Sequence, residues 1–474
     1  MKRQLAALLL TIFALSLTAC GETAAESETR TVYAMDTVMN LTVYGENAAA
    51  ALESAEKELH TLDEAVLSRT AEGSELYALN ASNGETVECG ADDILPALIE
   101  TALTISDATE GAFDPTLAPV LDAWGFTKDE RRVPSADELK ELLSHTGCGK
   151  VALEKTADGW TVTLLDGAQL DLGGIAKGYA ADLLRAQLEK EGVTSATLDL
   201  GGDVFVMGRK TDGSDWRIAV KDPADTESYL GVVSAADKFI VTSGVYERYF
   251  EENGVRYHHI LDPKTGCPAE SGLVSVTVLC GNGAWADALS TACFVLGPDG
   301  ALALRDDLAD QGTNFELILA TDDGRVLYTD GLADAFTPND ESGTRMKRSP
   351  KLKPTKWDAL VVLAVLLLAL GLGARPYFAA KSAGELTVSI AIDGETVERC
   401  ALSTYEGGTY ESRGYMLTVE VADGAVYVAS SDCPNQDCVH SGAISRAGQS
   451  IVCLPARVAV TLEGAASDYD LIAG

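Results

Sequence analysis

An uncharged apolar run over residues 359–374, preceded by a basic stretch, divides this chain of 474 residues into two unequal parts. Sixteen residues of helix reach about 24 Å, somewhat less than the hydrocarbon core of a bilayer, which is about 30 Å thick. The flanking Lys356 and Arg375 can extend toward the lipid headgroups and close this difference. We therefore predict a transmembrane helix over residues 358–374, and a buried soluble helix is the alternative.

The two parts differ in the structure that their residue patterns predict. Residues 30–340 mix helical spacings with short alternating strands and lack regular βαβ alternation, which predicts one α+β domain with mixed α and β elements. The main predicted segments are helices over 48–67, 91–108, 136–144, 178–191 and 284–296, and strands over 32–44, 151–154, 161–165, 197–200, 204–207, 216–220, 239–242 and 275–279. Residues 341–357 form a basic linker, and residues 385–474 form a small β-rich domain with glycine-containing turns.

The first twenty residues are typical of an export signal. A basic start with Lys2 and Arg3 precedes an apolar stretch over 5–17, and the signal ends in Leu17-Thr18-Ala19-Cys20. A cysteine directly after Leu-Thr-Ala resembles the lipobox of bacterial lipoproteins, in which that cysteine carries lipid. We predict a signal peptide over 1–20, lipidation of Cys20, a tether over 21–29, and attachment to the extracytoplasmic face of a bacterial cell membrane. An ordinary signal peptide is the alternative.

The formal net charge of −36 is spread along the chain without a long acidic block. A surface of this kind repels phosphate backbones, so nucleic acid is excluded as a partner. A ligand that carries phosphate must then be bound with the help of a cation or of a helix N-terminus.

Glycine and aspartate recur in four stretches of the larger domain, at residues 111–116, 171–179, 200–204 and 259–266. Gly173 and Gly174 lie between a short apolar strand and a helix, where glycines let the backbone approach a ligand and the helix N-terminus offers N–H groups to phosphate. Lys177 adds a positive charge in the first turn of that helix. A plain tight turn would also explain the glycine pair, which does not match the three-glycine dinucleotide fingerprint.

Asp287 and Thr291 are four residues apart on a predicted helix and therefore share one face. A carboxylate and a hydroxyl, completed by a backbone carbonyl and water, form the oxygen-rich shell that suits Mg²⁺. A surface aspartate beside a threonine that bonds to its own helix is the alternative.

Together with Ala34-Met35-Asp36-Thr37 near the start and the segment over residues 286–292, these stretches resemble the ApbE family of FAD:protein FMN transferases over about residues 30–335. The resemblance implies contacts to FAD from residues of these motifs, namely Met35, Ala112, Phe113, Asp114, Asp171, Lys177 and Ile260. It also implies that the carbonyl of Gly174 and the side chains of Asp287 and Thr291 bind Mg²⁺. Some members carry a second aspartate where this chain has Ser290.

The resemblance implies an Mg²⁺-dependent transferase. A threonine or serine hydroxyl of an acceptor protein attacks the phosphorus on the FMN side of FAD, and AMP leaves. The first candidate for the general base is His259 and the second is Asp171, whereas the neighbouring His258 is expected at the surface. An FAD pyrophosphatase and a non-catalytic FAD-binding lipoprotein are the alternatives. By analogy, the acceptor is a flavoprotein subunit of a membrane redox complex of the Rnf or sodium-pumping quinone reductase type.

Three cysteines cluster in the small domain, at Cys433, Cys438 and Cys453. The residues around them resemble the NusG domain II family. Because an exported domain favours oxidised thiols, we predict a disulfide between Cys433 and Cys438, and a metal site that adds His440 is the alternative.

The basic linker conflicts with export of the larger domain. An exported lipoprotein would place the six basic residues of 341–357 outside the membrane, against the positive-inside rule. Residues 346–374 instead resemble the start of a separate anchored protein with its N-terminus inside. We therefore hypothesise that two neighbouring genes are joined in this sequence.

Overall fold

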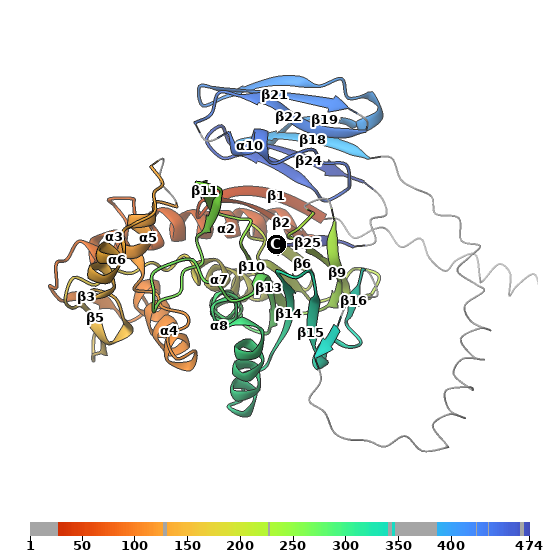
Figure 1. Ribbon diagram of the computed structural model, residues 1–474. Helices are drawn as coiled ribbons and strands as arrows, with labels where there is room; N and C mark the ends of the chain where they lie inside the picture. The colour runs from red at the N-terminus through yellow and green to blue at the C-terminus, as the bar shows by residue number, and fades with distance from the viewer. Residues whose placement is uncertain are drawn as a thin grey trace, which may run out of the picture.

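A nine-stranded sheet forms the centre of the larger domain in the computed structural model (Figure 1). The structure describes residues 27–126, 130–225, 228–339, 344–346, 386–422, 424–434, 436–464 and 469–474. The predicted signal peptide, Cys20 and the predicted transmembrane helix over 358–374 therefore lie outside the described residues. None of the helices within the described ranges is long and apolar enough to cross a membrane.

The strands of this sheet follow the order β1-β2-β6-β7-β10-β13-β14-β15-β17. Their bounds are β1 (Ser27–Ala34), β2 (Thr37–Tyr44), β6 (Ala196–Asp199), β7 (Val204–Met207), β10 (Lys238–Gly244), β13 (Leu273–Cys280), β14 (Phe315–Thr321), β15 (Val326–Thr329) and β17 (Thr344–Met346). All neighbouring pairs are antiparallel except β15 and β17.

Both faces of the sheet are covered, because alternate side chains enter two separate cores. On β7, Phe205 and Met207 pack on the side of the helices, whereas Val204 and Val206 pack against a second sheet. The second sheet has the order β16-β9-β8-β25, with β8 (Trp216–Lys221), β9 (Tyr229–Ala235), β16 (Phe336–Pro338) and β25 (Leu471–Ala473). The larger domain is thus a layer of helices, a central sheet and a smaller sheet.

Helices cover the other face, and α8 packs on β10 and β13. The helices of the larger domain are α2 (Ala48–Thr61), the π-helical turn η1 (Leu62–Leu67), α3 (Glu75–Asn80), α4 (Ile94–Ala108), α5 (Ala118–Trp124), α6 (Ala136–Leu143), η2 (Cys148–Lys150), α7 (Ala176–Lys190), α8 (Gly283–Asp310) and η3 (Asp330–Leu332). The predicted helix over 284–296 ends where α8 kinks, because Gly297 leaves the helical conformation directly before Pro298.

Two smaller sheets complete the larger domain. They consist of β3 (Val87–Gly90), β4 (Val151–Lys155) and β5 (Gly159–Leu164), and of the pair β11 (Tyr249–Glu252) and β12 (Val255–His258). The predicted α+β class with mixed elements is confirmed. The single strand predicted over 32–44 is wrong, because Met35 and Asp36 both adopt positive φ and fold this segment into the hairpin β1–β2.

Residues 386–464 fold into a separate β-rich domain with its own core, drawn in blue in Figure 1. One sheet contains β18 (Thr387–Ile392), β19 (Glu395–Ala401), β23 (Ser450–Cys453) and β24 (Val458–Glu463), and the other contains β20 (Gly408–Ser412), β21 (Tyr415–Ala422) and β22 (Ala425–Ser431). The short helices η5 (Leu402–Thr404) and α10 (Asp437–His440) lie between strands.

The end of the chain does not stay with the small domain, which differs from the domain predicted over 385–474. Strand β25 pairs in parallel with β8 of the larger domain. The carboxylate of Asp470 binds Lys210 at 2.5 Å and accepts a hydrogen bond from the backbone N–H of Arg217 at 2.7 Å. The two domains also meet where the guanidinium of Arg457 lies 5.7 Å from the ring centre of Tyr33.

Candidate active site

Helices α7 and α8 cross in backbone contact, and this crossing positions the candidate metal ligands. A Cβ atom on Gly178 would lie 2.1 Å from the carbonyl oxygen of Gly283, and one on Gly283 would lie 2.2 Å from the carbonyl oxygen of Gly178. One turn beyond Gly283, Asp287 accepts a hydrogen bond from the N–H of Gly178 at 3.0 Å. The carboxylate of Asp182 holds the start of α8 by accepting from the N–H groups of Gly283 and Ala284, both at 2.9 Å.

The structure brings the three predicted Mg²⁺ ligands together near the start of α7. A Cβ atom on Gly174 would lie 3.6 Å from the hydroxyl oxygen of Thr291 and 3.4 Å from the ring of Phe113. Asp287 is buried and lies one helical turn from Thr291. A carboxylate, a hydroxyl and a backbone carbonyl are the hard oxygen donors that Mg²⁺ prefers, so the residues present fit this ion.

Buried charges around this point are unbalanced in favour of carboxylates. Lys177 forms an ion pair with Asp203. Burial would lower the pKa of Lys177, but the carboxylates of Asp203, Asp287 and Glu247 outweigh it and raise this pKa. Burial, with the charge of Asp287 added, raises the pKa of Asp203 well above its usual value although Lys177 opposes the shift. Burial also raises the pKa of Asp199 to about 6. Because the partly buried Lys177 faces two buried carboxylates, those of Asp203 and Asp287, an added cation would be stabilised here.

Ser290, which stands where some family members have an aspartate, is fully buried. Its hydroxyl lies 2.7 Å from the carbonyl oxygen of Asp287 and 2.7 Å from the hydroxyl of Ser243 on β10. Ser290 therefore links α8 to the central sheet.

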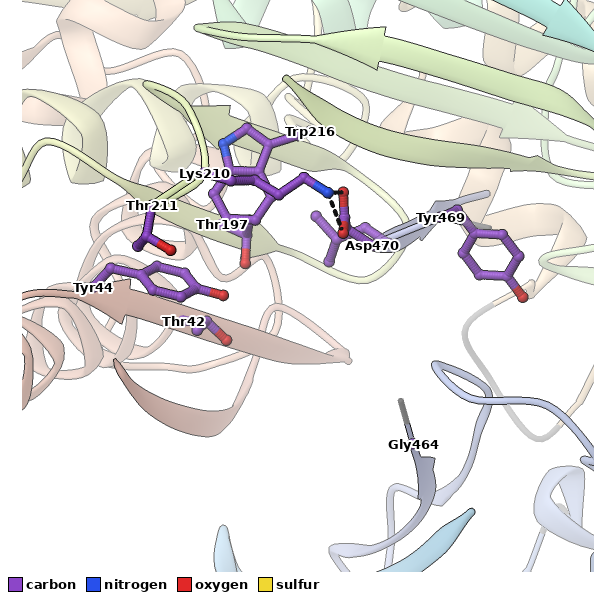
Figure 2. Close-up of a pocket in the computed structure, with 10 residues that line it drawn as sticks. Thr42, Tyr44, Thr197, Lys210, Thr211, Trp216, Gly464, Tyr469 and Asp470 are labelled. Atoms are coloured by element: carbon purple, nitrogen blue, oxygen red, sulfur yellow. Dashed lines mark hydrogen bonds and ion pairs between the residues drawn. The ribbon is translucent and has the colours of Figure 1, made fainter. Parts of the chain in front are cut away.

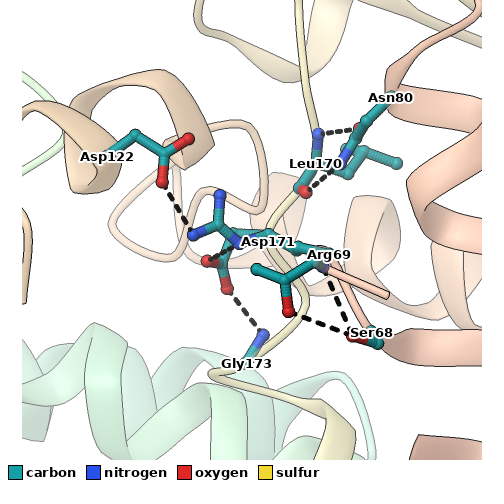
Figure 3. Close-up of polar contacts among 8 residues, drawn as sticks. Ser68, Arg69, Asn80, Asp122, Leu170, Asp171 and Gly173 are labelled. Carbon is teal, nitrogen blue, oxygen red and sulfur yellow. Dashed lines mark hydrogen bonds and ion pairs between the residues drawn. The ribbon is translucent and has the colours of Figure 1, made fainter. Parts of the chain in front are cut away.

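Asp171 holds the turn that begins α7 (Figure 3). One carboxylate oxygen accepts a hydrogen bond from the N–H of Gly173 at 2.8 Å, and the other binds the guanidinium of Arg69 at 2.9 Å. Arg69 also binds Asp122 at 3.0 Å, and the side chain of Asn80 makes two hydrogen bonds to the backbone of Leu170. Since both oxygens of Asp171 are engaged, the geometry favours a positioning role over that of a general base.

The first motif lines the same region from another loop. Ala112 and Phe113 are buried, and the ring of Phe113 lies against Gly174. The carboxylate of Asp114 accepts hydrogen bonds from the N–H and hydroxyl groups of Thr116, at 2.8 and 2.6 Å. Asp114 therefore orders this loop. The predicted FAD contact Met35 lies in the β1–β2 turn and packs partly against the main core.

His259 follows β12, and its surroundings fix which ring nitrogen is free. The backbone N–H of His259 donates to the carbonyl oxygen of Arg248 at 3.0 Å, and the ring nitrogen Nδ1 of His259 lies 3.2 Å from the same oxygen. A proton on Nδ1 satisfies that contact, which leaves Nε2 as the acceptor. Burial, with the charge of Arg248 added, lowers the pKa of His259 to about 3, so the ring is neutral at pH 7.

The expectation that His258 lies at the surface is wrong. The side chain is buried and packs edge-to-face on Phe294, with ring centres 5.5 Å apart. Burial lowers the pKa of His258 to about 4. A histidine has both apolar and polar surface, and the alternation of a short strand does not indicate which of two neighbouring histidines faces inward.

The loop over residues 259–266 is anchored to a distant part of the chain. Ile260 is buried, and its carbonyl oxygen accepts a hydrogen bond from the N–H of Ala269 at 2.9 Å. The indole N–H of Trp124 donates to the carbonyl oxygen of Gly266 at 2.8 Å. Helix α5, which follows the stretch over 111–116, is thus held to the stretch over 259–266, far from it in the sequence.

Sequence reasoning missed Arg69, Glu247 and the backbone of Arg248, which hold or surround the predicted residues. They lie outside the glycine- and aspartate-rich stretches, and no spacing pattern connects them to those stretches.

A pocket of about 500 Å³ lies where the chain returns from the small domain, and none of the predicted site residues lines it (Figure 2). Its lining consists of Thr42, Tyr44, Thr197, Lys210, Thr211, Trp216, Gly464, Tyr469, Asp470 and Leu471. This pocket therefore belongs to the junction of the two domains.

The predicted disulfide is not present. The Sγ atoms of Cys433 and Cys438 lie 3.8 Å apart, and both residues are free cysteines. A third sulfur, from Cys453, shares their space, and His440 is exposed outside this group.

Comparison with known proteins agrees with this arrangement. The sequence profile of the ApbE family matches residues 35–314, and the profile of NusG domain II matches residues 360–466. The chain is 37% identical over 332 residues to the FAD:protein FMN transferase of Treponema pallidum, which covers 66% of this chain and 90% of that protein.

Two solved structures share the fold of the larger domain. The ApbE protein of Thermotoga maritima is 34% identical, with a TM-score of 0.59, covering 65% of this chain and 98% of the other. The flavinyl transferase ApbE of Pseudomonas stutzeri, in its apo form, is 31% identical to this chain, with a TM-score of 0.58. The match covers 67% of this chain and 99% of the other.

Proposed function

Since the chain belongs to the ApbE family, we propose that its larger domain transfers FMN from FAD to a threonine or serine hydroxyl of an acceptor protein. The reaction releases AMP and depends on Mg²⁺. The observation that carries this proposal is the convergence of Gly174, Asp287 and Thr291 at the start of α7, beside buried carboxylates that outnumber their lysine partner.

Gly174, Asp287 and Thr291 would hold Mg²⁺, which when bound neutralises negative charge on the pyrophosphate. The rest of the diphosphate site comes from α7. The positive end of its helix dipole faces this region, and the absence of a side chain at Gly173 and Gly174 lets phosphate oxygens approach the backbone there. Lys177 adds a positive charge in the first turn of α7, and its ion pair with Asp203 fixes the direction of its side chain.

His259 is the proposed general base. The acceptor oxygen forms a bond to the phosphorus on the FMN side of FAD, the anhydride bond to AMP breaks, and the hydroxyl proton passes to Nε2 of His259. In the free site the pKa of His259 is about 3, mainly because the ring is partly buried. The negative phosphates of bound FAD stabilise the protonated ring and raise this pKa toward the range in which a base works well.

Two other activities fit the same site. In an FAD pyrophosphatase water replaces the acceptor hydroxyl and free FMN is released, and a non-catalytic binder leaves FAD intact. Incubating the protein with FAD, Mg²⁺ and candidate acceptors separates the three outcomes. Mass spectrometry that finds an acceptor heavier by one FMN residue supports the transferase, whereas free FMN or unchanged FAD contradicts it.

For the location and the partner, we propose a lipoprotein attached through Cys20 to the extracytoplasmic face of a bacterial cell membrane. The support is the lipobox-like sequence before Cys20. The proposed acceptor is a flavoprotein subunit of a membrane redox complex of the Rnf or sodium-pumping quinone reductase type. Labelled palmitate should enter the chain and should be lost in Cys20→Ala. An unlabelled chain would contradict the anchor without bearing on catalysis.

A further inference from the structure

Three buried cysteines converge in the small domain, far from the proposed flavin site in the sequence. Cys433 follows β22, Cys438 lies in α10 and Cys453 ends β23, and their side chains are 3%, 1% and 1% exposed. Their Sγ atoms all lie within 4.8 Å of one another. Among the residues that the structure describes, this is the one group of three or more cysteine, histidine or acidic side chains whose ligand atoms come so close.

The distance between the sulfurs suits a shared metal ion. Two thiolates that each lie about 2.3 Å from zinc, at the tetrahedral angle, are about 3.8 Å apart, whereas the sulfurs of a disulfide are about 2.05 Å apart. The Sγ atoms of Cys433 and Cys438 are separated by 3.8 Å. Four residues separate these two cysteines in the sequence, which is within the usual spacing of paired zinc ligands.

We propose that Cys433, Cys438 and Cys453 form a three-thiolate site for one soft metal ion, with Zn²⁺ as its test ion. Thiolate ligands select zinc or Cu⁺ over Mg²⁺ and Ca²⁺. Each thiol that coordinates gives its proton to solvent, so binding of one Zn²⁺ releases up to three protons. The fourth position goes to a small ligand from solvent such as water, because His440 lies outside the group.

The site would also stabilise the small domain. The three cysteines belong to its hydrophobic core and come from α10 and the ends of two strands in different sheets. A metal ion bound by all three would join these elements, and its binding free energy would add to the stability of the fold.

The test measures zinc bound to the reduced full chain. The protein is equilibrated with Zn²⁺ in excess Mg²⁺, which occupies the proposed flavin site, and is then desalted before elemental analysis. We expect one zinc per chain, lost in Cys433→Ser, Cys438→Ser and Cys453→Ser alike. Cys400→Ser is the matched control, since Cys400 lies in the same domain outside the group and should leave the zinc in place.

A spectroscopic measurement on the unmodified chain tests the proposal even if the cysteine variants fail to fold. Co²⁺ added to the unmodified reduced chain should give thiolate-to-cobalt charge-transfer absorption, and Zn²⁺ should abolish it. Reduced protein that binds neither ion would overturn the proposal. So would a Cys453→Ser variant that keeps the zinc, or a native chain in which peptide mapping finds Cys433 and Cys438 joined.

Discussion

Replacing Gly178 by alanine tests whether the crossing of α7 and α8 sets the geometry of the proposed metal site. The added Cβ atom would lie 2.1 Å from the carbonyl oxygen of Gly283 and 2.7 Å from Cβ of Asp287, whereas real Cβ contacts essentially never fall below 3.0 Å. The helices must therefore separate by about 1 Å, and a displacement of this size at an active site can reduce the rate about 100-fold. Overpacking of this kind also costs about 1–3 kcal/mol of stability.

The assay follows FMN transfer to an acceptor by flavin fluorescence, at saturating FAD and over a range of Mg²⁺ concentrations. We expect Gly178→Ala to lower kcat and to require more Mg²⁺, because Asp287 moves away from Gly174. Gly283→Ala should have a similar effect, and the double variant should lose little more than either single one, since both changes relieve the same contact.

Gly281→Ala is the control for this experiment. Gly281 directly precedes the residues that begin α8, and a Cβ atom there has no neighbour within 4 Å. This variant should keep the activity and Tm of the unmodified chain. If Gly178→Ala also kept both, the close crossing of the helices would not position the ligands, and the reasoning above would be refuted.

Three further predictions concern single side chains. Asp287→Asn should keep the hydrogen bond from the N–H of Gly178 but lose the negative charge, so Tm should change little. FMN transfer should fall by about 100-fold or more, because metal-ion charge stabilisation contributes several kcal/mol and each 1.36 kcal/mol is about tenfold in rate. Unchanged transfer at low Mg²⁺ would contradict the role of Asp287. Arg69→Met should free the carboxylate of Asp171, and because hydrogen bonds to charged groups contribute about 1.5–3 kcal/mol, steady-state kinetics should show KM for FAD raised about tenfold. Burial lowers the pKa of His258 from 6.5 to about 4, so below pH 6.5 the unfolded chain binds a proton that the folded chain does not, and stability falls as the pH drops toward 4. Thermal melts of His258→Gln should show a weaker dependence on pH over this interval, and an unchanged slope would mean that other groups cause it.

Local patterns predicted most helices and central strands, because their signals are contained within a few turns or residues. The helix predicted over 178–191 corresponds to α7, and the strand predicted over 204–207 corresponds to β7. The hairpin β1–β2 was not predicted, because its turn is built from Met35 and Asp36 and not from the usual glycine or asparagine. The spacing of apolar residues along the sequence does not show that Met35 and Asp36 adopt positive φ.

The candidate site was predictable where motifs carry it and hidden where single distant residues support it. The family resemblance placed Gly174, Asp287 and Thr291 in one site, and the crossing of α7 and α8 brings them together. Arg69 lies about a hundred residues before Asp171, and its ion pair depends on the final packing of the chain. The third cysteine likewise joins its partners only through the pairing of β23 with β24.

The return of β25 to the larger domain means that the two domains are connected twice. One connection is the covalent segment between residues 339 and 386, and the other is the pairing of β25 with β8 in a sheet of the larger domain. A protease that cuts within that segment would therefore leave a nicked molecule whose halves still elute together. If two genes do encode the two parts, the shorter polypeptide would carry its own docking peptide, and mixing separately produced halves should reconstitute the whole.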